Sequence, residues 1–230
     1  MPDFTWMMFA VFPYIAVALA VIVSIKRFKD NSYSISSFST QFLENEKASV
    51  GLRLWHWGLL PVLILHFFVL FFPKAWLKLI RVPTGLYVLE VLGAALGLAA
   101  LVGITILIQR RISNKRLRAI SKPLDFVVLT LLFLQILSGI VMAYMYRWGS
   151  AWAPHTLVPW LWSLIKLNPN LDYINTMPHL IKFHMFNAFL LVALVPFTKL
   201  IHFLAFPIDY ILRPPQVVIW NRKHGVDKYN

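Results

Sequence analysis

The chain has 230 residues, of which 59% are hydrophobic and only 13% are charged. Soluble globular chains carry about 45–50% apolar and about 25% charged residues, so this composition could not provide a water-exposed surface. It therefore excludes a soluble domain and indicates a chain that is solvated by lipid. Cysteine is absent, which excludes disulfides, cysteine-ligated iron–sulfur clusters and thiol catalysis. Any metal or cofactor must be held by histidine, methionine or carboxylate ligands.

Five segments are apolar over about 20 residues, the length that a helix needs to cross a bilayer. The predicted spans are residues 6–25, 54–72, 86–108, 124–144 and 179–206. No basic stretch precedes the first span, so we expect it to remain in the protein rather than act as a cleaved signal peptide. Residues 152–167 are also apolar but contain two prolines, and we expect an interfacial segment there. The pattern predicts an all-α bundle of five transmembrane helices.

The formal net charge of +13 arises from 22 Lys and Arg against 9 Asp and Glu. Most of the basic residues fall in the loops after the first and third predicted spans and in the C-terminal tail. Cytoplasmic loops of membrane proteins are enriched in Lys and Arg. The distribution therefore predicts that the N-terminus lies outside and the C-terminus in the cytoplasm. Membrane orientation accounts for the charge, and no nucleic-acid partner is expected.

Four of the seven histidines fall within predicted spans: His56 and His66 on the second, His184 and His202 on the fifth. Ionisable groups are costly in lipid, so four of them on two spans indicate a metal or cofactor site. The two spans run in opposite directions across the membrane. Antiparallel packing therefore pairs His66 with His184 toward the outside and His56 with His202 toward the cytoplasm. A continuous helix would place His184 and His202, five turns apart, on one face.

Two histidines that face each other across an apolar gap suit a haem b that is ligated on both sides, whereas zinc or copper needs more clustered ligands. Six-coordinate iron has no open position, which favours electron transfer. Lys182 near the outer pair and Lys199 near the inner pair are candidates to neutralise haem propionates. Two alternatives belong to other classes of protein: a transporter or proton channel that uses the histidines as a relay, and a structural anchor for a soluble enzyme.

Short motifs surround these histidines in a fixed order. They are Leu54-Trp55-His56-Trp57-Gly58, His66-Phe67-Phe68, Phe183-His184 and, over residues 196–202, Pro-Phe-Thr-Lys-Leu-Ile-His. With these motifs the chain resembles the gamma subunit of membrane-bound respiratory nitrate reductase, or a close relative such as the membrane subunit of a nitrite oxidoreductase. The likeness extends from Pro13-Tyr14-Ile15 to Pro207-Ile208-Asp209-Tyr210 and is weaker over residues 147–178.

The resemblance implies a five-helix cytochrome b in residues 1–206 that binds two b haems, the outer one through His66 and His184 and the inner one through His56 and His202. It implies that residues 207–230 form a cytoplasmic tail that docks soluble subunits. The family oxidises quinol at the outer face of the cell inner membrane. Electrons then pass through the haems to an iron–sulfur beta subunit and a molybdopterin-containing alpha subunit, where nitrate is reduced. The chain would thus link the quinone pool of the respiratory chain to a quinol:nitrate oxidoreductase.

One departure from the family concerns the quinol site. The family has a lysine at the start of the third helix, but the matching stretch here is Thr84-Gly85-Leu86-Tyr87. Lys78 and Arg81 are nearby candidates to replace it, and Glu90, one turn into the third span, is a candidate proton acceptor. The missing lysine leaves an alternative open, in which a nitrite-oxidising complex passes electrons outward to a quinone or a cytochrome c.

Overall fold

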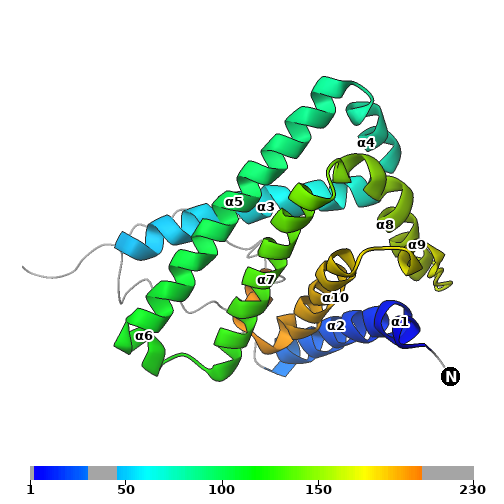
Figure 1. Ribbon diagram of the computed structural model, residues 1–230. Helices are drawn as coiled ribbons and strands as arrows, with labels where there is room; N and C mark the ends of the chain where they lie inside the picture. The colour runs from blue at the N-terminus through cyan, green and yellow to red at the C-terminus, as the bar shows by residue number, and fades with distance from the viewer. Residues whose placement is uncertain (1–2, 31–45, 204–230) are drawn as a thin grey trace, which may run out of the picture.

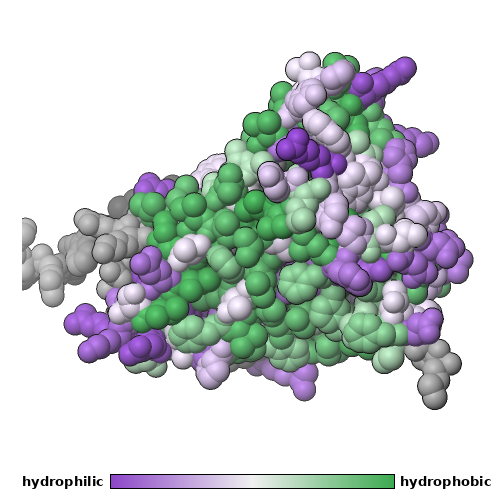
Figure 2. Space-filling view, in the orientation of Figure 1, coloured by the Kyte–Doolittle hydropathy of each residue, from purple (hydrophilic) through white to green (hydrophobic). Residues whose placement is uncertain are grey.

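The computed structural model describes residues 3–30 and 46–203, and every regular element in these ranges is a helix. Five helices are long and apolar enough to cross a membrane: Phe4–Asp30, Val50–Phe71, Pro83–Ser113, Pro123–Met145 and His179–Phe197. The prediction of an all-α protein with five transmembrane helices is confirmed. In Figure 2 apolar residues cover the broad middle of the visible face, and hydrophilic residues gather toward its ends, as expected for a surface in contact with lipid.

From α3 onward the elements follow one another with short connections (Figure 1). Their bounds are α1 Phe4–Trp6, the π-helical η1 Met7–Val11, α2 Phe12–Asp30, α3 Glu46–Phe71, α4 Pro73–Ile80, α5 Pro83–Ser113, α6 Lys115–Ala119, α7 Pro123–Met145, α8 Gly149–Ile165, α9 Asp172–Asn175, α10 His179–Leu194, and the 3-10 turns η4 Val195–Phe197 and η5 Lys199–Phe203. Proline opens α4, α5 and α7 at a position where the helix needs no N–H donor. The spanning helices pack in the order α3, α5, α7, α10, α2.

Helices α3 and α5 pack with their backbones in direct contact. A Cβ atom on Gly58 would lie 2.5 Å from the amide nitrogen of Ala100, and one on Gly103 would collide with the backbone of Trp55. Gly58, which lies between His56 and His66 in the sequence, therefore serves helix packing. Small residues permit such close approach in membranes, where dispersion and shape rather than hydrophobic burial hold helices together.

Helix α8 fastens the ends of several spans to one another. Pro154 has no N–H to donate to the carbonyl of Ser150, four residues earlier, so that carbonyl is free to accept a 2.8 Å hydrogen bond from Trp76 Nε1 of α4. The N–H of Ser150 belongs to the unsatisfied first turn and donates to Glu90 Oε1 of α5 at 2.9 Å. The indole of Trp162 donates to the carbonyl of Leu70 on α3 at 3.0 Å. This segment, expected at the interface, is thus an integral part of the bundle.

The fifth predicted span does not continue as one α-helix. Helix α10 ends at Leu194, one 3-10 turn follows through Pro196, and Thr198 is extended with φ −126° and ψ 178°. Arg27 of α2 donates to the carbonyl of Pro196, which satisfies a group that the broken helix leaves open. The expectation that His184 and His202 share a helix face assumed one uninterrupted α-helix, and the chain forms no such helix between them.

The glycines of α5 give a matched test of the contact between α3 and α5. Gly103→Ala should lower the free energy of unfolding by about 1–3 kcal/mol, the usual cost of overpacking. Gly93→Ala should leave it unchanged or raise it slightly, because a Cβ there meets nothing within 4 Å and alanine favours a helix. Thermal unfolding of the purified protein in detergent measures both, and equal melting temperatures for the two variants would contradict the packing argument.

Candidate functional site

His56 and His66 of α3 are held by their own helix. His56 Nδ1 lies 2.9 Å from the carbonyl oxygen of Leu52, and His66 Nδ1 lies 2.7 Å from that of Val62. Since a carbonyl only accepts, each Nδ1 carries the proton and each Nε2 keeps its lone pair. This tautomer is the one in which imidazole can ligate a metal through Nε2, while the other nitrogen fixes the orientation of the ring.

His202 lies on the 3-10 turn η5, and its Nδ1 donates to the carbonyl of Lys199 at 2.6 Å. The ammonium of Lys199 is 3.4 Å from Asp125 Oδ2, and Arg111 Nη1 is 3.1 Å from the same oxygen. Asp125 also accepts the backbone N–H of Lys122 at 3.2 Å, so this carboxylate caps α7. The turn that carries His202 is thereby tied to the ends of α5 and α7.

His184 of α10 has hydrogen-bond partners at both ring nitrogens. Ser138 Oγ of α7 lies 2.9 Å from Nδ1, and the side-chain amide of Gln135 lies 3.0 Å from Nε2. The amide of Asn187 donates in turn to Gln135 Oε1 at 2.7 Å. A Cβ on Gly139 would lie 3.2 Å from His184 Cε1, so this glycine gives the ring room beside α7.

The sequence-based prediction pairs His66 of α3 with His184 of α10. Yet α3 and α10 are not among the closely packed helix pairs of the described residues: α3 packs on α5, and α10 packs on α7 and α2. Figure 1 shows α7 between α5 and α10. The two histidine-bearing helices are therefore connected through α5 and α7 rather than by direct packing on each other.

The donor set fits histidine pairs better than a clustered metal site. No group of three or more His, Cys, Asp or Glu residues that could hold a metal ion occurs among the residues described, so a zinc site of ordinary composition has no ligand set in this part of the chain. Three of the four histidines present Nε2 with Nδ1 bound to a backbone carbonyl. These features are compatible with two bis-histidine haems. Lys182, the second candidate for a propionate, donates to the carbonyl of Asn175 at 3.0 Å.

The candidate quinol residues lie near the junction of α4, α5 and α8. Glu90 is half-buried and accepts the N–H of Ser150, while Lys78 on α4 and Arg81 after it are exposed. Within the described ranges no ion pair joins Glu90 to either basic residue. Glu90 therefore contributes to the fold as the N-terminal partner of α8, and one of its carboxylate oxygens is committed to that hydrogen bond.

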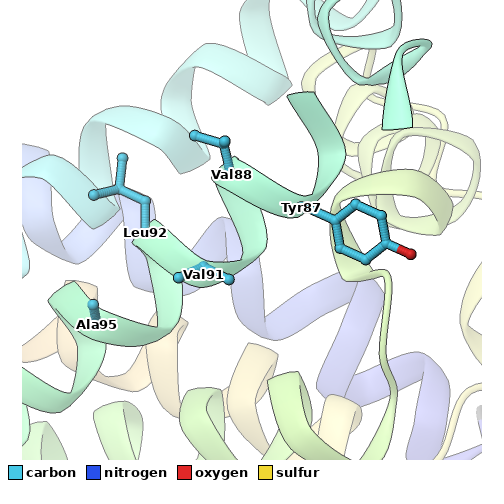
Figure 3. Close-up of a pocket in the computed structure, with 5 residues that line it drawn as sticks. All are labelled: Tyr87, Val88, Val91, Leu92 and Ala95. Carbon is cyan, nitrogen blue, oxygen red and sulfur yellow. The ribbon is translucent and has the colours of Figure 1, made fainter. Parts of the chain in front are cut away.

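A shallow groove runs along α5 on the side of Tyr87, Val88, Val91, Leu92 and Ala95 (Figure 3). Its lining is almost wholly apolar. Tyr87 packs edge-on against Trp148, with 5.2 Å between the ring centroids. The groove offers a surface for an apolar molecule, but its lining supplies no acid, base or metal ligand.

Sequence reasoning missed Gln135, Ser138, Gly139 and Asn187, the residues that surround His184. The only signal was the presence of three polar or very small side chains within five residues of an otherwise apolar span. Polar residues inside a membrane face a bundle interior or a cavity, but the sequence did not show which helix they would meet.

Comparison with known proteins places these features in a wider group. A family model described as nitrate reductase gamma subunit matches residues 5–221. The chain is 29% identical over 209 residues to the nitrate reductase gamma chain of Bacillus subtilis, covering 90% of this chain and 94% of that one. It is 27% identical over 219 residues to the respiratory nitrate reductase 1 gamma chain of Escherichia coli, covering 91% and 95%. A match of 27% identity to the nitrate reductase-like protein NarX of Mycobacterium tuberculosis covers 89% of this chain and 32% of that one.

Proposed function

We propose an electron path for this chain. The chain belongs to the nitrate reductase gamma subunit family. It is therefore a multi-pass membrane subunit of a respiratory nitrate reductase, which is an oxidoreductase complex. The observation that carries the proposal is the set of four histidines on α3, on α10 and on the turn η5, of which three bond Nδ1 to a backbone carbonyl and so present Nε2. Two haems b would be held by His66 with His184 and by His56 with His202.

Haem supplies one-electron transfer, and bis-histidine ligation leaves the iron no open position for oxygen or substrate. The chain's own residues then have defined tasks. Leu52 and Val62 orient the rings of His56 and His66 through their carbonyls. Lys199, already paired with Asp125, and Lys182 are the nearest candidates to balance propionate charge.

The path runs from the outer to the cytoplasmic side of the cell inner membrane. This orientation follows from the basic residues around α6, which comes after the C-terminal end of α5. Cytoplasmic segments are enriched in Lys and Arg. Oxidation of one quinol at the outer side releases two protons there and two electrons, which pass inward one at a time. The receiving partners would be an iron–sulfur beta subunit and, beyond it, a molybdopterin-containing alpha subunit.

Glu90 is proposed as the first proton acceptor from quinol. Lys78 and Arg81 are proposed as hydrogen-bond partners for the oxygen atoms of quinol. The support is their common position at the junction of α4, α5 and α8, next to the apolar groove of α5. One oxygen of Glu90 accepts from Ser150, which leaves the other able to receive a proton.

A nitrite-oxidising complex is a second candidate, favoured by the absence of lysine from Thr84-Gly85-Leu86-Tyr87. Electrons would then leave through the membrane subunit to a quinone or a cytochrome c. A purified complex that quinol analogues cannot reduce, but that accepts electrons from nitrite, would favour this alternative.

The histidine pairs can be tested separately. His66→Ala should remove the outer haem and spare the inner one, and His202→Ala should do the reverse, because each variant breaks only one pair. Reduced-minus-oxidised spectra of the purified complex, combined with haem quantification, measure both. His179→Ala, at the start of α10 and outside both pairs, is the matched control and should retain two haems. If neither His66→Ala nor His202→Ala loses a haem, the assignment is wrong.

Proton acceptance at Glu90 predicts a kinetic defect without loss of haem. Glu90→Gln keeps an amide oxygen for the N–H of Ser150, so α8 should stay in place, but it removes the proton-accepting carboxylate. Stopped-flow reduction of the haems by a quinol analogue should slow by about 10²–10⁴-fold, the range for a lost general base. Reduction by dithionite should be unchanged. A wild-type rate with quinol would eliminate Glu90 from the proton path.

The docking role of residues 207–230, which lie outside the described part of the chain, leads to a separate expectation. Truncation after Leu212 should leave both haem signals intact while weakening capture of the soluble subunits. Co-purification of the soluble subunits with tagged full-length and truncated chains measures this. Equal recovery from both would show that docking depends on other surfaces.

A further inference from the structure

The polar side chains around His184 form a chain of hydrogen bonds whose directions are fixed. Asn187 Nδ2 donates to Gln135 Oε1 at 2.7 Å and to the carbonyl of Leu131 at 3.0 Å. With its oxygen thus engaged, the Gln135 amide presents nitrogen to His184. An amide nitrogen can only donate, so Nε2 of His184 is the acceptor of that 3.0 Å hydrogen bond.

The hydrogen bonds at Nδ1, the other ring nitrogen of His184, indicate the same tautomer. Ser138 Oγ donates its single proton to the carbonyl of Gln135 at 3.0 Å. It must therefore accept from His184, whose Nδ1 lies 2.9 Å away. Both observations place the proton on Nδ1 and the lone pair on Nε2. The network thus imposes on His184 the same tautomer that backbone carbonyls impose on His56, His66 and His202.

This network lies between α7 and α10, and two of its members are buried. Ser138 is 5% exposed and Asn187 is 2% exposed, and their partners lie on α7 and α10. Buried polar side chains are costly unless fully bonded, and in lipid the helices gain little from hydrophobic contact to offset that cost. These side chains join α7 to α10, and the directions of their hydrogen bonds also fix the tautomer of His184.

We propose that Ser138, Gln135 and Asn187 are positioning residues that hold His184 with its Nε2 lone pair ready for the iron of the outer haem, and that the acceptor Ser138 sets the potential of that haem. This inference rests on the proposed function. Gln135 donates to Nε2, so it would hold the ring in the absence of haem and would have to release this nitrogen for it to serve as a ligand. Ser138 stays at Nδ1, where accepting the proton makes imidazole a stronger electron donor to the metal.

The sign of the effect follows from this donation. A more basic ligand stabilises ferric iron over ferrous iron and lowers the reduction potential. Ser138→Ala should therefore raise the midpoint potential of the outer haem and leave that of the inner haem unchanged. Ser138→Thr keeps the hydroxyl and should restore the wild-type value. Thr130→Val is the matched control, because this hydroxyl on the same helix bonds only to the carbonyl of Phe126 and should shift neither potential.

The experiment is a redox titration of the purified complex followed optically and by electron paramagnetic resonance, with haem content measured in parallel. Ser138→Cys is near-isosteric, but its thiol is a weaker hydrogen-bond acceptor. It should shift the midpoint potential of the outer haem in the same direction as Ser138→Ala. It therefore provides the test if Ser138→Ala fails to assemble. Gln135→Leu should lower outer-haem occupancy while leaving the potential of the haem that does bind unchanged.

The outcomes separate this inference from the function on which it rests. A wild-type complex without two bis-histidine haem signals would overturn both. Two such haems in the wild type, with the outer potential and resonance unaltered in Ser138→Ala and Ser138→Cys, would overturn the role of Ser138 alone. Loss of the outer haem with retention of the inner one in Ser138→Ala would support a positioning role, since the retained haem reports a folded bundle.

Discussion

A lipid interior offers no hydrogen bonds, and this constraint governs the arrangement of polar groups in the chain. Ser150 illustrates it: proline at position 154 removes the donor to its carbonyl, Trp76 replaces that donor, and Glu90 satisfies its N–H. The same need binds the Nδ1 atoms of His56 and His66 to their own helix. Bonding the imidazole N–H and fixing the orientation of the ring are thus achieved by the same contacts.

The spanning helices are joined by two different kinds of contact. Helices α3 and α5 meet backbone to backbone through Gly58 and Gly103, where no side chain intervenes. Helices α7 and α10 meet through Gln135, Ser138 and Asn187, where side chains carry the contact. The backbone contact makes the pair of α3 and α5 rigid through close fit. The side-chain contact between α7 and α10 fixes the orientation of the His184 ring through the directions of its hydrogen bonds. His184 depends on the second, whereas His56 and His66 lie on the helix that uses the first.

The sequence predicted the five spans, the all-α class and the family, because apolar length and motif order are local properties. It did not predict the end of α10 at Leu194. A proline inside a membrane helix is compatible with a mild kink. Only tertiary contacts, such as that of Arg27 with Pro196, favour a complete break. The sequence did not predict the role of Gly58 either, because this glycine is explained only by the backbone of α5 beside it. The partners of His184 required the pairing of α7 with α10, which no periodicity in a uniformly apolar span reveals.

The order of packing has a consequence for biogenesis. Helices α3 and α5 are near neighbours in the chain, linked by α4, so they can associate as a hairpin soon after they enter the membrane. Helix α2, made first, packs on α10, which is made last, and must wait in the bilayer until synthesis is nearly complete, because chains are built from the N-terminus. His184 enters with α10. The hydrogen bonds that join His184 to α7 therefore form only at the end of insertion.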